Sequence, residues 1–429
     1  MKKIISKLMG GVLLFSLSMS LTSCEGALDD ILGEWSRPTP GSSTGGAVAV
    51  TGIDLDADEM KLTVGDKGQL TAKVDPVGTA VTWSSDKEEI ATVDVNGMVT
   101  AVAVGTAIIT AKAGDKSATC EVTVLPTLST PLTIEAITQG KITVTGPKAG
   151  MQYSLNGGAK KAVTTTSIDV AAGGKVAFYG QGISITSYDG TTIDGDGDGF
   201  KCKVYGNIMS LVDETGFATK TKLTATSTFQ SLFNGNTKLT DASGLLLPAT
   251  TLTVGCYDRM FQGCTALTAA PAELPATSLA NSCYRDMFFG CTSLTTAPAL
   301  SATELAEFCY ASMFYNCSSL TTAPALPVTE LKGRCYISMF CGCSSLTTAP
   351  KLPATTLAQE CYASMFNGCS SLTTAYVKAA YTTTGNACNN MFNGCTNAST
   401  STFYSDDAAN WKSNFSTLSS WQAAAYPTE

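Results

Sequence analysis

Hydrophobic and polar positions follow different patterns along the chain. From residue 48 to residue 126, short β-branched runs such as 61–64, 69–74 and 107–111 are separated by Gly, Asp and Pro. Short alternating runs continue from 130 to 222, and from 223 to 400 many apolar positions are instead four residues apart. Alternation predicts strands, whereas a four-residue spacing predicts one face of a helix.

The four-residue spacing belongs to a repeated unit. A Met-Phe pair begins at Met260, Met287, Met313, Met339, Met365 and Met391, in steps of 27, 26, 26, 26 and 26 residues. A fixed period of this length predicts a solenoid, in which each unit is stabilised by stacking on its neighbours. Within one unit Leu357, Cys361, Met365 and Cys369 are four residues apart, which predicts a helix, and 372–375 is expected to be extended.

Two cysteines eight residues apart, such as Cys361 and Cys369, occur in most units. On a helix they would be separated by about 12 Å, so one unit cannot chelate zinc with them. The same separation exceeds the limit of about 7 Å between the Cα atoms of a disulfide. We therefore expect small apolar core residues. Disulfides between units are the second alternative and a metal site is the third.

Composition and charge exclude several classes of function. The 429-residue chain has 14% charged residues and no histidine. Without histidine, Ser-His-Asp catalysis, Cys-His catalysis and the HExxH metalloprotease pattern are excluded. A carboxylate-pair glycosidase passes this test and stays as the enzyme alternative. The formal net charge of −8 disfavours nucleic acid as a partner, because no basic stripe is present to neutralise phosphates.

The first 47 residues predict export and anchoring. Three lysines precede an apolar run at 8–21, which is too short to span a membrane and remain there. The run ends in LTSC at 21–24, which resembles the lipobox of bacterial lipoproteins. The resemblance implies that residues 1–23 are a signal peptide and that Cys24 carries the acyl chains of a stable anchor. An ordinary secretory signal is the alternative. Residues 24–47 predict a flexible tether.

The segment 48–126 carries a second resemblance. It reads VGDKGQLTAKV at 64–74, VTWSSDKEEIATVDVNGMVTAVAVGTAIITA at 81–111 and ATCEVTV at 118–124. These stretches resemble the group 2 bacterial Ig-like domain. The resemblance implies a β-sandwich that acts as a spacer or an adhesive module. Trp83 is expected in its core, and Cys120 is expected to be a buried thiol.

The segment 130–222 is predicted to be a β-rich domain that caps the open end of the solenoid. Within it, Asp194, Asp196 and Asp198 alternate with glycines and could converge on Ca²⁺. The EF-hand pattern requires Glu at loop position 12, where this chain has Tyr205. Asp-Gly repeats also form turns. Calcium is therefore one of two interpretations, and no other cofactor is expected.

The repeats resemble the leucine-rich repeats of BspA-like surface proteins of Bacteroides-type bacteria. Their units carry a Met-Phe pair, a Cys three residues on and a Leu three after that, as in Cys291 and Leu294. The resemblance implies a multidomain protein with an α/β leucine-rich-repeat solenoid over 223–400. Residues 401–429 are expected to cap its end through Trp411, Phe415 and Trp421.

One tyrosine follows the first cysteine of each full unit: Tyr257, Tyr284, Tyr310, Tyr336 and Tyr362. If exposed, this row would suit stacking on sugar rings or on a protein partner. The alternative, which we favour, is that the rings only cover the neighbouring unit.

These observations predict a non-catalytic lipoprotein of the outer membrane, exposed at the cell surface. The BspA-like resemblance implies adhesion to a host or neighbouring-cell protein. The second hypothesis is a glycan-binding accessory lipoprotein of a polysaccharide uptake system. A carboxylate-pair glycosidase is the third, because the repeats contain few acidic residues.

Overall fold

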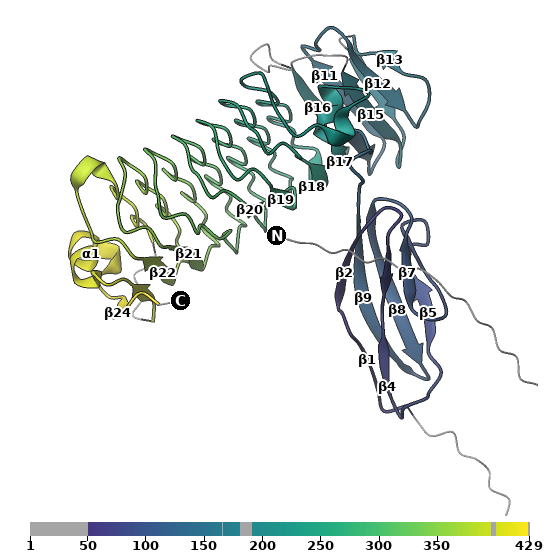
Figure 1. The fold of residues 1–429 in the computed structure, drawn as a ribbon, viewed down its shortest axis with the longest axis horizontal. Helices are drawn as coiled ribbons and strands as arrows, with labels where there is room; N and C mark the ends of the chain where they lie inside the picture. Colours follow the sequence, from purple (N-terminus) through teal and green to yellow (C-terminus); the bar gives the residue numbers. More distant parts are fainter. Residues whose placement is uncertain (1–49, 165, 181–190, 396–399, 428–429) are drawn as a thin grey trace, which may run out of the picture. The chain divides into compact units, whose positions relative to one another are not determined.

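Figure 1 shows a computed structural model, which describes residues 50–164, 166–180, 191–395 and 400–427. The predicted signal peptide at 1–23, the lipidation site Cys24 and the tether at 24–47 lie outside the described residues. Regular structure is almost entirely β, and the described residues contain a single α-helix, α1 (Ala408–Asn414). No helix in this part of the chain has the length and hydrophobicity needed to cross a membrane. The predicted α/β leucine-rich-repeat solenoid is therefore wrong in its fold class.

Residues 50–125 form a β-region with its own hydrophobic clusters. Its strands are β1 (Gly52–Leu55), β2 (Glu59–Thr63), β3 (Lys67–Gln69), β4 (Ala72–Asp75), β5 (Thr82–Ser85), β6 (Ala91–Val93), β7 (Met98–Ala101), β8 (Gly105–Ala113) and β9 (Lys116–Leu125). They pair as β1-β4, β2-β9-β8-β5 and β3-β7-β6. Alternation along β8 buries Ala107, Ile109 and Ala111. Trp83 packs half-buried against this core and Cys120 is fully buried.

A second β-region precedes the repeats. Its elements are β10 (Thr133–Ala136), β11 (Gly140–Thr145), β12 (Met151–Leu155), β13 (Lys161–Ala162), β14 (Thr166–Val170), β15 (Lys175–Gly180), β16 (Thr192–Asp196), β17 (Cys202–Asn207) and the 3-10 helices η2 (Ile208–Leu211) and η3 (Phe217–Thr219). One sheet has the order β13-β12-β15-β10-β17-β18 and the other β14-β11-β16. Because β17 pairs in parallel with β18 (Leu239–Leu246), this region joins the first repeat through backbone hydrogen bonds.

Each repeat forms one coil, and every coil is hydrogen-bonded to the next. In the coil around Met287, the amides of Cys283 and Arg285 donate to carbonyls three residues earlier, at 3.2 and 3.3 Å. The amides between them alternate in direction: Tyr284 donates to Cys309 at 3.0 Å and Asp286 to Ala311 at 2.9 Å. Half of the amides in this stretch therefore close turns within the coil, and half bind the following coil.

The predicted helix through Leu357, Cys361, Met365 and Cys369 is also wrong. Within this stretch Glu360, Ser364 and Gly368 have φ angles of 49°, 55° and 77°. One left-handed residue in every four is incompatible with a right-handed α-helix. The chain instead runs through successive turns that return to the same orientation after four residues. Cys361, Met365 and Cys369 consequently share a buried side without any helix.

Short parallel strands line another side of the coils. They are β19 (Glu273–Leu274), β20 (Ala299–Leu300), β21 (Thr348–Leu352), β22 (Thr374–Val377), β23 (Thr402–Tyr404) and β24 (Gln422–Ala424). The sheets are β19-β20 and β21-β22-β23-β24. The 3-10 helices η4 (Thr384–Asn386) and η5 (Ser416–Leu418) complete the regular structure. Of the range 372–375 that was expected to be extended, 374 and 375 belong to β22.

The C-terminal segment covers the last coil. Trp411 of α1 is fully buried and donates from its indole nitrogen to the carbonyl of Ala379 at 3.0 Å. The rings of Trp411 and Phe415 lie 6.2 and 5.6 Å from the ring of Phe392, which belongs to the last Met-Phe pair. Trp421 is buried in the same cluster. This segment therefore shields apolar surface that no further coil would cover.

Ser364 tests the turn conformation against a helix. In a helix, Gly is destabilising by about 1 kcal/mol relative to Ala. At a left-handed residue the order reverses, because Ala has a Cβ and Gly does not. We expect Ser364→Gly to be more stable than Ser364→Ala by about 1 kcal/mol in urea denaturation. If Ser364→Ala were the more stable of the two variants, the result would support a helix at this position.

Candidate functional site

Two columns of aromatic rings run through the interior of the coils. The first contains Phe233, which follows Leu232, and the phenylalanines of the Met-Phe pairs up to Phe392, with neighbouring ring centroids 5.4–5.7 Å apart. The second contains the predicted tyrosine row, Tyr257, Tyr284, Tyr310, Tyr336 and Tyr362, with centroids 5.6–6.2 Å apart. Their exposed fractions are 0–2%. The row therefore lies inside the protein, and an exposed binding row does not fit these positions.

Three hydroxyl groups in the tyrosine column have no partner. The phenol oxygens of Tyr257, Tyr284 and Tyr310 are buried and form no hydrogen bond with any described residue. Burial raises the pKa of all three phenols well above the usual value. Leaving a buried polar group unpaired costs about 1–3 kcal/mol. These hydroxyls therefore oppose the stabilisation that the stacked rings provide.

The cysteines of the repeats form a ladder in the interior. Every described cysteine is a free thiol, and all of them except Cys341 are buried. The thiol of Cys291 donates to the carbonyl of Phe261 at 3.0 Å, and Cys317 donates to Phe288 at 3.1 Å. Burial raises the pKa of both thiols well above the usual value. A protonated, buried thiol is neither a nucleophile nor a metal ligand, so these side chains serve packing between coils.

The three aspartates of the predicted calcium site do not converge. Asp194 and Asp196 belong to β16, and Asp198 follows in the turn after the strand. Asp194 accepts a hydrogen bond from the amide of Gly195 at 2.7 Å, and burial raises its pKa. Among the described residues, no three acidic or cysteine side chains are grouped closely enough to hold a metal ion. In this structure the three aspartates belong to a strand and the turn that follows it.

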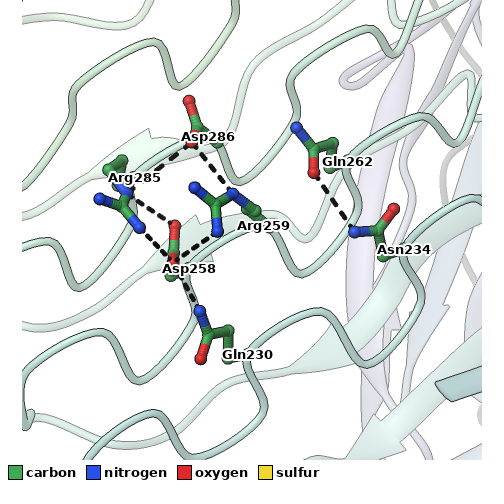
Figure 2. A network of polar contacts seen from close by, with 7 residues as sticks. All are labelled: Gln230, Asn234, Asp258, Arg259, Gln262, Arg285 and Asp286. Atoms are coloured by element: carbon green, nitrogen blue, oxygen red, sulfur yellow. Dashed lines mark hydrogen bonds and ion pairs between the residues drawn. The ribbon is translucent and has the colours of Figure 1, made fainter. Parts of the chain in front are cut away.

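Figure 2 shows a polar network that the sequence reasoning missed. Asp258 is 1% exposed, and Arg285 of the next coil donates to both of its carboxylate oxygens, at 3.1 and 2.8 Å. Gln230 of the preceding coil donates to the same carboxylate at 2.8 Å. Arg259 lies 3.3 Å from the carboxylate of Asp286. Charges on successive coils are thereby paired across the stack.

The ion pairs of this network join neighbouring coils. Burial raises the pKa of Asp286 and the nearby charge of Asp258 adds to the shift, while Arg259 and Arg285 oppose it. The sequence does contain a signal: the order Asp-Arg at 258–259 is reversed to Arg-Asp at 285–286, one repeat later. Reversal at equivalent positions places opposite charges next to each other when the coils stack. Each acid is paired with an arginine of a neighbouring coil, which fits a structural role.

Two grooves lie along the proline-rich side of the coils. One has a volume of about 610 Å³ and includes Glu304, Glu330 and Lys332. The other has a volume of about 590 Å³, and we call it the lysine–tyrosine groove. It is lined by Lys351, Lys378, Asp406, Tyr426, Pro327 and Pro353. Both volumes fall within the range of about 300–1,000 Å³ that is typical of ligand sites.

Tyr310 tests the unpaired hydroxyls. Tyr310→Phe should raise the free energy of unfolding by about 1 kcal/mol, because the ring stack is kept and an unsatisfied polar atom is removed. Tyr310→Ala should lower it by about 3–5 kcal/mol through loss of the ring. Urea denaturation measures both. Tyr315→Ala, at a half-buried ring outside the column, is the control and should cost less. A destabilised Tyr310→Phe variant would show that the hydroxyl is satisfied.

Asp258 tests the polar network. We expect Asp258→Ala to lower the free energy of unfolding by about 3 kcal/mol, because the buried Gln230 and the partly exposed Arg285 lose their acceptor. Glu360→Ala is the matched control. It breaks a more exposed ion pair, with Arg334 of the preceding coil, and should cost about 1 kcal/mol or less. Equal losses for the two variants would contradict a special role for the network.

Comparisons with known proteins match parts of the chain. A lacto-N-biosidase of Bifidobacterium bifidum is 46% identical over 80 residues, which are 18% of this chain and 7% of that protein. An α-L-arabinofuranosidase of Bifidobacterium longum is 39% identical over 110 residues, 24% of this chain and 10% of that protein. An uncharacterized protein of Clostridium acetobutylicum is 36% identical over 120 residues, 27% and 11% of the two chains. The chain therefore spans about a tenth of the length of these relatives.

Two solved structures match parts of the chain at low identity. Domains 5–6 of the S-layer protein SbsC are 19% identical with a TM-score of 0.17, covering 31% of this chain and 85% of that one. A structure of domains 1–6 of the same protein is 18% identical with a TM-score of 0.18, covering 38% of this chain and 26% of that one.

One segment of the chain matches a protein family. Residues 79–125 match the bacterial Ig-like domain, which confirms the Ig-like part of the sequence prediction.

Proposed function

We propose that this chain is a non-catalytic surface lipoprotein, anchored through Cys24, whose repeats present a binding surface. One observation carries the proposal: the interior of the coils is invariant while the outward positions vary. The position of Val254, which is exposed in most coils, holds Asn281, Glu307, Gly333 and Gln359 in the following coils. A constant stacking core with a varied exterior is typical of repeat proteins that bind partners along an extended surface.

The chemistry of the repeats supports binding rather than catalysis. The repeated thiols, except Cys341, and the phenols of the tyrosine column could act as nucleophiles or acids, but they are buried. Burial raises the pKa of groups such as Cys291 and Tyr284, so they stay protonated at neutral pH. The groups that face solvent are hydroxyls, amides and isolated charges. These suit recognition of a partner.

The partner class we propose is a protein or glycan of a host or neighbouring cell. The spacing of Met-Phe, Cys and Leu that resembles BspA-like surface proteins supports adhesion, without their α/β fold. The Ig-like segment supports a spacer or adhesive role at the outer face of the outer membrane. Glycan capture for a polysaccharide uptake system is the second candidate, and the lysine–tyrosine groove favours it. The glycosidase names among the relatives concern proteins of which this chain spans about a tenth, and they support a shared module only.

An array tests the function. The mature chain from Cys24 onward, produced as Cys24→Ser so that it stays in solution, should bind at least one matrix protein or glycan on an array of both. Heat-unfolded chain on the same array is the control for nonspecific adsorption. In the native host, metabolic palmitate should label the wild-type chain and not Cys24→Ser. A folded chain that binds nothing, or one that cleaves a glycan, would contradict the proposal.

A further inference from the structure

The lysine–tyrosine groove is lined by Lys351 of β21 and by residues that follow β22, β23 and β24. Figure 1 shows β21, β22 and β24 close to the C-terminal end of the repeats. In β21 the burial pattern places Lys351 outward between buried residues. In β22, Thr374 and Tyr376 are half-buried while Ala375 and Val377 are buried. Because Lys378 is two residues after Tyr376, alternation places both on the same face. Lys351 and Lys378 therefore lie on one face of this sheet. Asp406 and Tyr426 follow β23 and β24, and Pro327 belongs to the coil before β21.

Aromatic rings continue along this face. Lys351 is in register with Tyr376, and Tyr376 is in register with Tyr404 of β23. The rings of Tyr376 and Tyr404 stack with centroids 4.6 Å apart, and both are only half-buried. Tyr426 follows β24, and the ammonium of Lys378 lies 5.9 Å from its ring centroid. Cationic groups and aromatic rings are thus interleaved over four adjacent strands.

The two lysines of the groove favour an anionic ligand. Lys351 and Lys378 are exposed, and within the described ranges neither lies within 4.0 Å of a carboxylate. Two lysines line one groove in a chain whose net charge is −8. The one acid of the groove, Asp406, accepts a hydrogen bond from the amide of Tyr426 at 3.2 Å and so holds that ring at the rim. Like charges kept in one groove repel each other, and an anionic ligand relieves the repulsion.

We propose that the lysine–tyrosine groove binds an acidic polysaccharide that carries its charge as carboxylates on the sugar rings. Lys351 and Lys378 form charge-assisted hydrogen bonds with carboxylates of the ligand. Tyr426 and the two prolines offer flat apolar surfaces to the faces of sugar rings. Asp406 accepts from ring hydroxyls. This site rests on the proposed binding function and assigns it a ligand class.

The charge pattern separates this ligand from other polyanions. Nucleic-acid sites combine many basic residues that follow the phosphate backbone. Here two lysines are interleaved with rings and accompanied by an aspartate, in a groove of about 590 Å³. Two separated positive charges and one carboxylate that can accept hydrogen bonds from hydroxyl groups fit a polymer with one carboxylate per sugar and many hydroxyls. A neutral glycan would leave both lysines without a counter-charge.

The test uses an oligogalacturonide as the probe, in calcium-free buffer, with isothermal titration calorimetry of the full mature chain. The fully methyl-esterified oligomer is the control, because it keeps the sugar backbone and removes the charge. Lys351→Ala/Lys378→Ala should weaken binding of the acidic probe about tenfold or more. Tyr426→Phe should bind like the wild type and Tyr426→Ala should bind more weakly. Lys112→Ala/Lys222→Ala removes the same net charge from exposed positions outside both grooves and should bind normally.

The outcomes distinguish the site from the general function. Equal affinity for the acidic and esterified probes, no binding of the acidic probe, or unchanged binding by the double groove variant would overturn the site. Equal binding of a single-stranded oligonucleotide would overturn the carboxylated sugar as ligand. If the double groove variant still retained the array partners of the wild-type chain, the site would fail while the binding function stood. A wild-type chain that bound no array partner would contradict both.

Discussion

The hydrogen bonds between successive coils are the interaction on which the repeat region depends. Tyr284 and Asp286 each donate to a carbonyl of the following coil, while Cys283 and Arg285 close turns within their own. A single coil would leave the first set of amides without partners and both of its aromatic rings exposed. Stability therefore arises between neighbours. Both ends need cover, which β17 supplies through β18 and the C-terminal segment supplies through Trp411.

Close stacking determines which polar groups inside the coils find hydrogen-bond partners. The thiol of Cys291 is satisfied by a carbonyl of the preceding coil, and Asp258 is satisfied by partners on both sides. The hydroxyl of Tyr284 finds no partner, because its neighbours in the column are rings at a spacing of 5.6–5.8 Å. These interior groups are committed to holding coils together. Recognition is left to side chains on the outside of the stack, where substitution leaves the ladder intact.

The outward positions can vary because each coil contributes mainly backbone and core atoms to its neighbours. This explains why the exposed position of Val254 holds Asn281, Glu307 and Gln359 in other coils. It also explains how two lysines and several tyrosines can gather on one face near the C-terminal end. Parallel strands bring equivalent positions of successive repeats side by side, so residues about 26 apart in sequence become neighbours. Substitutions at equivalent outward positions of successive repeats therefore change neighbouring side chains on one surface.

The sequence by itself determined the period of the repeats, the Ig-like segment and the identity of the core residues. Period and composition are visible along the chain, and an apolar side chain such as Phe314 is buried in any stacked arrangement. The aromatic residues of the C-terminal segment were predictable for the same reason. The burial of the cysteines was also expected, although it was inferred through a helix that does not exist.

Only the tertiary structure decided the conformation of the coil and the neighbours of each side chain. A four-residue period is shared by an α-helix and by turns with one left-handed residue in four, so spacing alone could not separate them. Gly263, Gly290, Gly342 and Gly368, which recur at equivalent left-handed positions, were the signal that favoured turns. The pairing of Asp258 with Arg285, the inward direction of the tyrosines and the lysine–tyrosine groove depend on which coils touch. Such contacts between residues about 26 or more apart are set by stacking, and local sequence preferences do not encode them.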